Sequence, residues 1–333
     1  MLALLGVFGV MMAGLAADAL LSSRSGEEEP SDDVLAEDDQ SDLGDGDLLD
    51  GIGGDTTIPT SDDIPDTADE AQYLKGGDEA DLLSGAGADD TILAHGGADL
   101  IDGRDGDDWV EAGAGNDVIW AAGGDDTAQG DEGNDTIYGG AGSDLLDGGS
   151  GADHLAGCEE NDTLHGGAGD DTLIGGLGDD WLEGDDDADW LVGAEGHDSL
   201  VGGAGRDDLD GGAGDDWISG AETGAQEADF LNGQAGNDTL ILGAGDTATG
   251  GEGDDQFVMQ EWMSESTVAT IMDYDPDQDQ LAIVYDPVVH PDPVLTIEQN
   301  PGGTGQVVFL DGARVAVVNG APVNISDIRL VTG

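Results

Sequence analysis

The chain has 333 residues, of which 77 are Asp or Glu and only 6 are Lys or Arg, so its formal net charge is −71. Because proteins bind nucleic acid through Lys and Arg, this balance excludes nucleic acid as a partner. A chain of this charge repels itself unless cations bind to it. Cys158 is the sole cysteine of the sequence, which excludes an intrachain disulfide.

The N-terminal quarter of the chain divides into an apolar and an acidic segment. Residues 1–22 are apolar apart from Asp18 and Ser22. Their uncharged run is short for a membrane span of about 20 residues, and no Lys or Arg precedes it as in a secretory signal. We expect a membrane anchor or signal-like export segment, with a buried N-terminal helix as the alternative. Residues 23–70 are rich in Asp, Glu, Ser and Pro, which predicts a disordered, acidic linker.

From Gly76 a nine-residue pattern repeats through sixteen unbroken rows. Position eight is Val, Ile or Leu in fifteen rows, and position four is Gly in twelve. An irregular row of thirteen residues (220–232) follows, and then three further rows, one of them shortened, which end at Val258. The regular spacing is clearest at position six of these rows, which is occupied by Asp81, Asp90, Asp99, Asp108, Asp117, Asp126, Asp135, Asp144, Asp153, Asp162, Asp171, Asp180, Asp189, Asp198, Asp207, Asp216, Asp238 and Asp255.

The nine-residue spacing predicts a stack of short strands and turns. Positions seven to nine have the pattern of a strand in which only position eight faces one side. One aliphatic side chain per row makes a core only when rows stack on one another. Glycines at positions one, two and four permit a tight turn with positive φ. Two rows therefore make one coil of eighteen residues with a sheet on each side, and about ten coils at ~4.8 Å per strand predict a stack roughly 48 Å long.

The aspartates at position six point to a metal. In this geometry the aspartates of rows n and n+2 stack together with turn carbonyls, and unpaired neighbouring carboxylates raise each other's pKa and oppose folding. Ca²⁺ accepts six to eight carboxylate and carbonyl oxygens, whereas Mg²⁺ demands a tighter octahedron and Zn²⁺ prefers Cys and His. We predict that the eighteen aspartates bind Ca²⁺, at most ~18 ions, and that binding and folding are one event.

The repeat resembles that of the RTX (repeats-in-toxin, haemolysin-type) calcium-binding family, Gly-Gly-x-Gly-x-Asp-x-U-x, where U is aliphatic. Rows 166–174, 175–183 and 211–219 match it at every position, and the resemblance covers residues 76–258. It implies an all-β fold, a parallel β-roll of two sheets with Ca²⁺ in both rows of turns. It also implies folding outside the cell and type I secretion through an uncleaved C-terminal signal. The apolar residues 1–22 depart from that secretion pattern and suggest a tether to the cell surface.

The last part of the chain, residues 259–333, changes character. Strand-like runs begin at Leu281, Gln306 and Arg314, and turn signals separate them. We expect a small β domain that caps the β-roll of residues 71–258 and resembles a type I secretion signal region. The segment 273–279 opens like an EF-hand loop but lacks its Gly and its final Glu, so a strand turn is expected.

Two irregularities predict weaker calcium sites. The rows without Gly at position four are expected to bind most weakly, and they carry Glu79, Ala88, Glu160 and Asp187. The thirteen-residue row is expected to break the register, which makes sites near Asp229 and Asp246 doubtful.

No His-Glu-x-x-His or Gly-x-Ser-x-Gly motif occurs, and linker, roll and cap leave no room for a catalytic domain. We therefore expect a non-enzymatic, secreted structural or adhesive protein. Two alternatives stay open: a Ca²⁺-dependent module for a carbohydrate or cell-surface partner, and a secreted enzyme with its site in 259–333. Position seven of the even rows bears on the first, because it forms a stripe that either binds a ligand or reflects ordinary strand preferences: Thr91, Trp109, Thr127, Leu145, Thr163, Trp181, Ser199 and Trp217.

Overall fold

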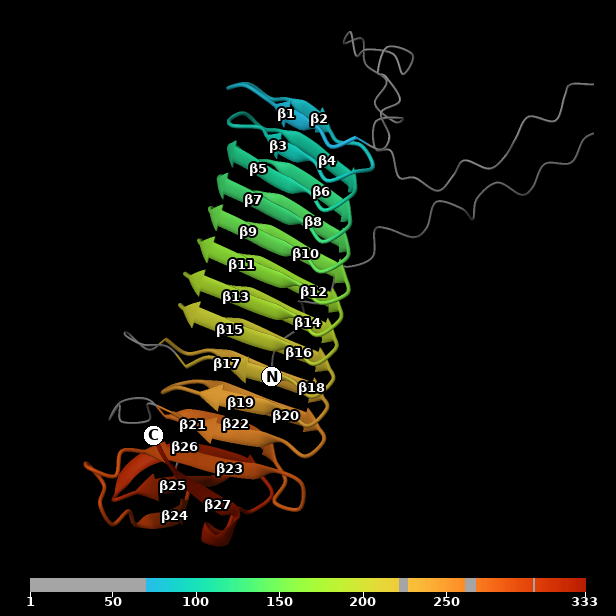
Figure 1. Cartoon of the computed structure of the whole chain (residues 1–333). Helices are drawn as coiled ribbons and strands as arrows, with labels where there is room; N and C mark the ends of the chain where they lie inside the picture. Colours follow the sequence, from blue (N-terminus) through green and yellow to red (C-terminus); the bar gives the residue numbers. More distant parts are fainter. Residues whose placement is uncertain (1–69, 222–226, 261–267, 302) are drawn as a thin grey trace, which may run out of the picture. The chain divides into compact units, whose positions relative to one another are not determined.

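The computed structural model describes residues 70–221, 227–260, 268–301 and 303–333. All of them belong to a single compact unit, Pro65–Gly333. Within this unit the chain winds through two sheets that face each other, and successive strands from β1 (Tyr73–Lys75) to β24 (Leu295–Gln299) alternate between the sheets (Figure 1). The predictions for residues 1–22, and for the linker up to residue 69, lie outside the described residues.

The first sheet, sheet A, has thirteen strands in the described part of the chain. In spatial order they are β1 (Tyr73–Lys75), β3 (Thr91–Leu93), β5 (Trp109–Ala114), β7 (Thr127–Glu132), β9 (Leu145–Ser150), β11 (Thr163–Ala168), β13 (Trp181–Asp186), β15 (Ser199–Ala204), β17 (Trp217–Ser219), β19 (Thr239–Leu242), β21 (Gln256–Met259), β23 (Gln280–Tyr285) and β27 (Ile328–Thr332).

The second sheet, sheet B, has fourteen strands in the same described ranges. In spatial order they are β2 (Leu82–Ser84), β4 (Leu100–Asp105), β6 (Val118–Gly123), β8 (Thr136–Ala141), β10 (His154–Glu159), β12 (Thr172–Leu177), β14 (Trp190–Glu195), β16 (Asp208–Ala213), β18 (Phe230–Ala235), β20 (Thr247–Glu252), β22 (Ala269–Tyr274), β26 (Ala313–Gly320), β25 (Gln306–Leu310) and β24 (Leu295–Gln299). A short 3₁₀ helix, η2 (Ile325–Asp327), precedes β27.

The register confirms the predicted coil of eighteen residues. Thr163 pairs in parallel with Trp181 on sheet A, and His154 pairs in parallel with Thr172 on sheet B. The strands are longer than the predicted triplet, since most run from position seven of one row through position three of the next. The repeat therefore spends six of its nine residues in a strand and three in the turn.

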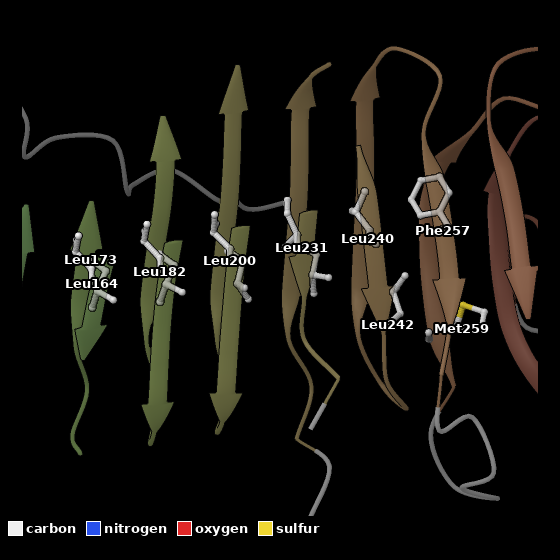
Figure 2. Close-up of a cluster of buried hydrophobic side chains, with 14 of the residues drawn as sticks. Leu164, Leu173, Leu182, Leu200, Leu231, Leu240, Leu242, Phe257 and Met259 are labelled. Atoms are coloured by element: carbon white, nitrogen blue, oxygen red, sulfur yellow. The ribbon is translucent and has the colours of Figure 1, made fainter. Parts of the chain in front are cut away.

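The core is a double column of position-eight side chains. Leu164, Leu173, Leu182 and Leu191 come from alternating sheets, and all four are fully buried. Figure 2 shows such leucines from both sheets pointing into the space between them, with Phe257 and Met259 continuing the column. Each fully buried Leu contributes roughly 1.5–3 kcal/mol to stability, so the column is the main apolar contribution of every row.

The turn glycines serve two different purposes. Positions two and four adopt positive φ, as at Gly167 (φ 103°) and Gly169 (φ 129°), which confirms the prediction for these positions. For position one the prediction is wrong, because Gly166 does not have a positive φ. A Cβ at Gly166 would instead lie 2.6 Å from Oδ2 of Asp171. Since the buried Ala94 also occupies position one, this position requires a small side chain rather than a left-handed backbone.

The sheets continue beyond the last repeat. β22 and β23 pair in parallel with β20 and β21, and β26 and β27 extend the two sheets further. The predicted strand-like runs are confirmed as β23, β25 and β26. β24 and β25 differ from the rest, because they join sheet B in antiparallel orientation. The C-terminal β region thus prolongs the same two sheets; sheet A ends with β27, and sheet B ends with the antiparallel strands β25 and β24.

Candidate calcium-binding ladders

The position-six aspartates form two hydrogen-bonded ladders, one along each row of turns. Asp153 donates its backbone N–H to Oδ1 of Asp171, at 2.7 Å, and Asp171 donates to Oδ1 of Asp189, at 2.8 Å. Each carboxylate thus holds the backbone of the preceding coil, eighteen residues earlier. All the predicted aspartates except Asp81 are buried, with 1–3% of their surface exposed.

Each ladder serves one sheet. The ladder that precedes the strands of sheet A contains Asp90, Asp108, Asp126, Asp144, Asp162, Asp180, Asp198, Asp216, Asp238, Asp255 and Asp279. The ladder that precedes the strands of sheet B contains Asp81, Asp99, Asp117, Asp135, Asp153, Asp171, Asp189, Asp207, Asp229 and Asp246.

The ladders include three aspartates beyond the eighteen that the repeat predicts. The expectation that the thirteen-residue row breaks the register is wrong, because Asp207 donates to Asp229 at 2.9 Å and Asp229 donates to Asp246 at 3.2 Å. The strands on either side of that row stay aligned, because β18 pairs in register with both β16 and β20. At the far end Asp255 donates to Asp279 at 3.2 Å, within the segment predicted to be a strand turn.

The second carboxylate oxygen of most rungs has no hydrogen-bond donor. In the described part of the chain this buried, unsatisfied Oδ2 recurs in Asp99, Asp108, Asp117, Asp126, Asp135, Asp144, Asp153, Asp162, Asp171, Asp180, Asp189, Asp198, Asp216 and Asp238. A buried carboxylate oxygen without a partner is costly, and native proteins pair such groups with donors or metal ions. A cation bound beside each of these Oδ2 atoms would therefore stabilise the ladder, at regular intervals along the roll.

Backbone oxygens surround the unsatisfied Oδ2 atoms. A Cβ at Gly148 would lie 2.6 Å from Oδ2 of Asp153 and 2.7 Å from the carbonyl oxygen of Gly166, so these two oxygens flank the same small space. Among the described residues, no three His, Cys, Asp or Glu side chains gather where they could hold a metal. An ion in these turns must therefore combine carboxylates with backbone carbonyls, and this oxygen-only donor set suits Ca²⁺.

Burial raises the pKa of many of the ladder carboxyls, among them Asp171 and Asp189. The pKa of Asp171 rises to about 7 and that of Asp189 to about 8, in both cases chiefly because burial disfavours the charged form. The backbone N–H from the preceding coil lowers the pKa of each carboxyl, and neighbouring carboxylates raise it. Desolvation is therefore the main effect that opposes ionisation of these two carboxyls. The repulsion between neighbouring carboxylates, which the sequence predicts, is a smaller effect.

A third line of side chains runs along the turns at position five. Asp125 donates its backbone N–H to Oδ1 of Asp107, at 2.9 Å, and Ser143 donates to Oδ1 of Asp125, also at 2.9 Å. These bonds run opposite to the main ladders, because each acceptor lies one coil earlier. The nine-residue consensus does not predict these bonds, although the frequent Asp and Asn at position five, such as Asn116 and Asn134, are a signal of them.

The comparison with protein families decides the identity of the repeat. The family described as RTX calcium-binding nonapeptide repeat matches seven segments that together cover more than half of the chain: 68–101, 75–110, 94–128, 120–155, 159–191, 183–218 and 223–247. The chain belongs to this family. The RTX assignment agrees with the parallel β-roll, and it names calcium as the ion of the repeats.

Other comparisons add less to the RTX assignment. No curated protein matches the RTX chain. One solved structure that matches is a hyperactive, Ca²⁺-dependent, β-helical antifreeze protein from an Antarctic bacterium, with 19% sequence identity. The alignment covers 67% of the RTX chain and 86% of the antifreeze protein, with a TM-score of 0.29. Separately, none of the helices in the described ranges of the RTX chain has the length and apolarity needed to cross a bilayer.

Proposed function

We propose that this protein is an extracellular scaffold whose β-roll folds when Ca²⁺ enters its two aspartate ladders. The eighteen position-six aspartates are the proposed ligands, together with Asp229, Asp246 and Asp279, which occupy equivalent rungs. Backbone carbonyls of the turns complete the coordination. In this proposal the role is structural or adhesive, and the chain is exported unfolded.

The observation that carries this proposal is the unsatisfied Oδ2 on fourteen stacked, buried aspartates. Without cations the chain must either bury these charges or protonate them, and both cost free energy at neutral pH. Calcium relieves this cost, and in doing so it links each coil to the next. Because the unfolded chain lacks these stacked sites, binding free energy becomes folding free energy.

Support for export comes from the chemistry of calcium. If the sites have the ~10⁻⁴–10⁻³ M Kd of extracellular calcium modules, as the proposal requires, the roll fills only where free Ca²⁺ is abundant. Membership of the RTX family agrees with this, as does a net charge of −71, which keeps the metal-free chain expanded and soluble. The C-terminal region 259–333 is the proposed type I secretion signal.

The C-terminal region contains a cavity, and it is there that the alternative of a secreted enzyme would place its site. The cavity has a volume of about 430 Å³ and lies between β24, β25 and β26. It is lined by Glu298, Gln299, Asn300, Pro301, Val307, Phe309 and Arg314. The lining contains one carboxylate and one guanidinium but no Ser, Cys or His.

The proposal is tested by locating the full-length chain in its own cells and digesting it with proteinase K. We expect protein in the medium or on washed cells, resistant to protease in millimolar Ca²⁺ and rapidly degraded after EGTA is added. Protein confined to the cytoplasm would contradict export. Resistance that survives EGTA would contradict folding by calcium.

A further inference from the structure

The outward face of sheet A carries a bulky apolar side chain on every second strand. These side chains lie 36 residues apart and each has 38–44% of its surface exposed: Trp109, Leu145, Trp181 and Trp217. The strands between them pair in register and place small hydroxyl side chains at the same position: Thr127, Thr163 and Ser199. We call this array the indole face. Its interval of two coils corresponds to ~9.6 Å, twice the strand spacing of ~4.8 Å.

Carboxylates lie next to the bulky side chains on the indole face. Side chains two residues apart along a strand project from the same side of the sheet. The residues two positions after Trp109, Leu145 and Trp181 are all acidic and half-buried: Glu111, Asp147 and Glu183. An ionised carboxylate accepts hydrogen bonds but cannot donate them. A ligand of this face must therefore supply donors such as hydroxyl groups, and an anionic ligand is repelled.

We propose that the indole face binds a neutral, extended polysaccharide of β-1,4-linked sugars lying along the axis of the roll. The apolar face of a sugar ring packs on an indole, while its hydroxyl groups donate to the neighbouring carboxylates. In such a polysaccharide successive rings are turned over, so the same ring face recurs once per disaccharide. That repeat has about the length of two strand spacings, which are ~9.6 Å. The regular interval of the indole face thus fits a polymer better than a small ligand.

Sheet B differs in ways that favour sheet A as the binding face. Three of its aromatic side chains contact one another, since Trp120 stacks on Tyr138 with ring centroids 6.1 Å apart and Tyr138 meets His154 edge-on. Trp190 and Phe230 lie two strands apart, so the aromatic side chains of sheet B follow no single interval. On β6, β8, β10, β12 and β14 the outward positions seven and nine carry no Asp or Glu that could accept from a hydroxyl group. Trp190 on β14 nevertheless occupies position seven with 45% exposure, which makes it a matched control.

The test measures binding of cellohexaose and chitohexaose, two neutral β-1,4-linked hexamers, to the full-length chain in millimolar Ca²⁺ by calorimetry. Trp181→Ala is expected to weaken binding about tenfold, the effect of losing one ring-stacking contact, whereas Trp190→Ala leaves it unchanged. A register variant, Thr163→Trp combined with Trp181→Thr, keeps the number of indoles but breaks the interval. It is expected to weaken binding as much as Trp181→Ala does.

Several outcomes would overturn the inference. If neither hexamer binds, the regular interval of the indole face reflects side-chain packing and not a ligand. Equal loss with Trp190→Ala would place the ligand elsewhere, and undiminished binding by the register variant would remove the role of the interval. Equal affinity for a hexamer of galacturonic acid would contradict the charge argument.

This inference rests on the proposed calcium-folded scaffold, and circular dichroism of each variant keeps the two apart. A chain that stays unfolded in Ca²⁺ defeats the proposed function. A chain that folds in Ca²⁺ but binds neither hexamer defeats the polysaccharide inference alone.

Discussion

The backbone N–H of Asp153 donates to Oδ1 of Asp171, one coil further along the chain and 2.7 Å away, while Oδ2 of Asp171 is buried without a hydrogen-bond donor. One carboxylate oxygen therefore sets the register between coils, and the other is left for a cation. This division explains why the repeat uses Asp at position six: the register needs only an acceptor, but the cation needs a charge.

Replacing Asp171 with Asn separates these two tasks. The amide oxygen of Asn can still accept the N–H of Asp153, but the negative charge at the calcium site is lost. We expect Asp171→Asn to lower the apparent Ca²⁺ affinity of the roll and its melting temperature in saturating Ca²⁺. In EDTA the effect should reverse, because the variant no longer buries a charge. Thermal unfolding followed by circular dichroism measures the loss in Ca²⁺, and the amount of β signal at neutral pH in EDTA measures the reversed effect.

The neighbouring residue supplies the control for this variant. Asp170 is the exposed position-five residue of the same row, and its Oδ1 accepts the N–H of Ala188. Asp170→Asn removes the same charge and preserves an acceptor, and we expect a change within about 0.5 kcal/mol. Equal effects of the two substitutions in Ca²⁺ would mean that position six has no special role in binding the ion.

The metal-free chain should gain β structure in acid. Burial raises the pKa of Asp144 and Asp162 to about 7 in the folded state, whereas an unfolded Asp titrates near pH ~3.9. Between these values the folded state binds more protons, so its stability falls as the pH rises from about 4 towards 8. In EDTA we expect more β signal at about pH 4 than at pH 7.5. Less β signal at the lower pH would contradict this linkage.

Row 184–192 offers a test of the turn conformation. Asp187 occupies position four with φ 77°, where a side chain costs about 1–2 kcal/mol relative to Gly. We expect Asp187→Gly to raise the stability of the calcium-loaded roll by about 1 kcal/mol. The paired variant Asp186→Gly removes the same charge from the end of β13 and should lower stability by roughly 0.5–1 kcal/mol. Denaturant unfolding in Ca²⁺ measures the free energy of unfolding of both variants. A loss of stability in Asp187→Gly would contradict the claim that the backbone of Asp187 is strained.

Periodicity made the strands, the inward position eight and the stacking of aspartates predictable, because each depends only on a row and its copy eighteen residues later. Asp229 could not be placed this way, since the repeat does not reveal whether extra residues enter a strand or a turn. Asp279 follows Asp255 by 24 residues, so the repeat does not predict its place on the ladder, which the pairing of β21 with β23 establishes. The need for a small side chain at position one could not be predicted, because the sequence does not show whether a glycine is required for its positive φ or for its small size.

The position-five ladder shows a different limit of the sequence. Asp107 and Asp125 occupy a position where Ala, Ser, His and Arg also occur in the repeat, so the consensus treats it as variable. The hydrogen bonds use whichever side chain has an acceptor, including Nδ1 of His197, which accepts the N–H of Asp215 at 2.8 Å. A role filled by several residue types leaves little trace in a consensus.

The central claim is that calcium is the folding agent of the roll, and far-UV circular dichroism of the full-length chain tests it most directly. The chain is titrated with Ca²⁺ and, in parallel, with Mg²⁺ at neutral pH. We predict a cooperative change from coil to β structure at millimolar Ca²⁺ that Mg²⁺ does not produce. Full β signal in EDTA, unchanged by Ca²⁺, would contradict the account.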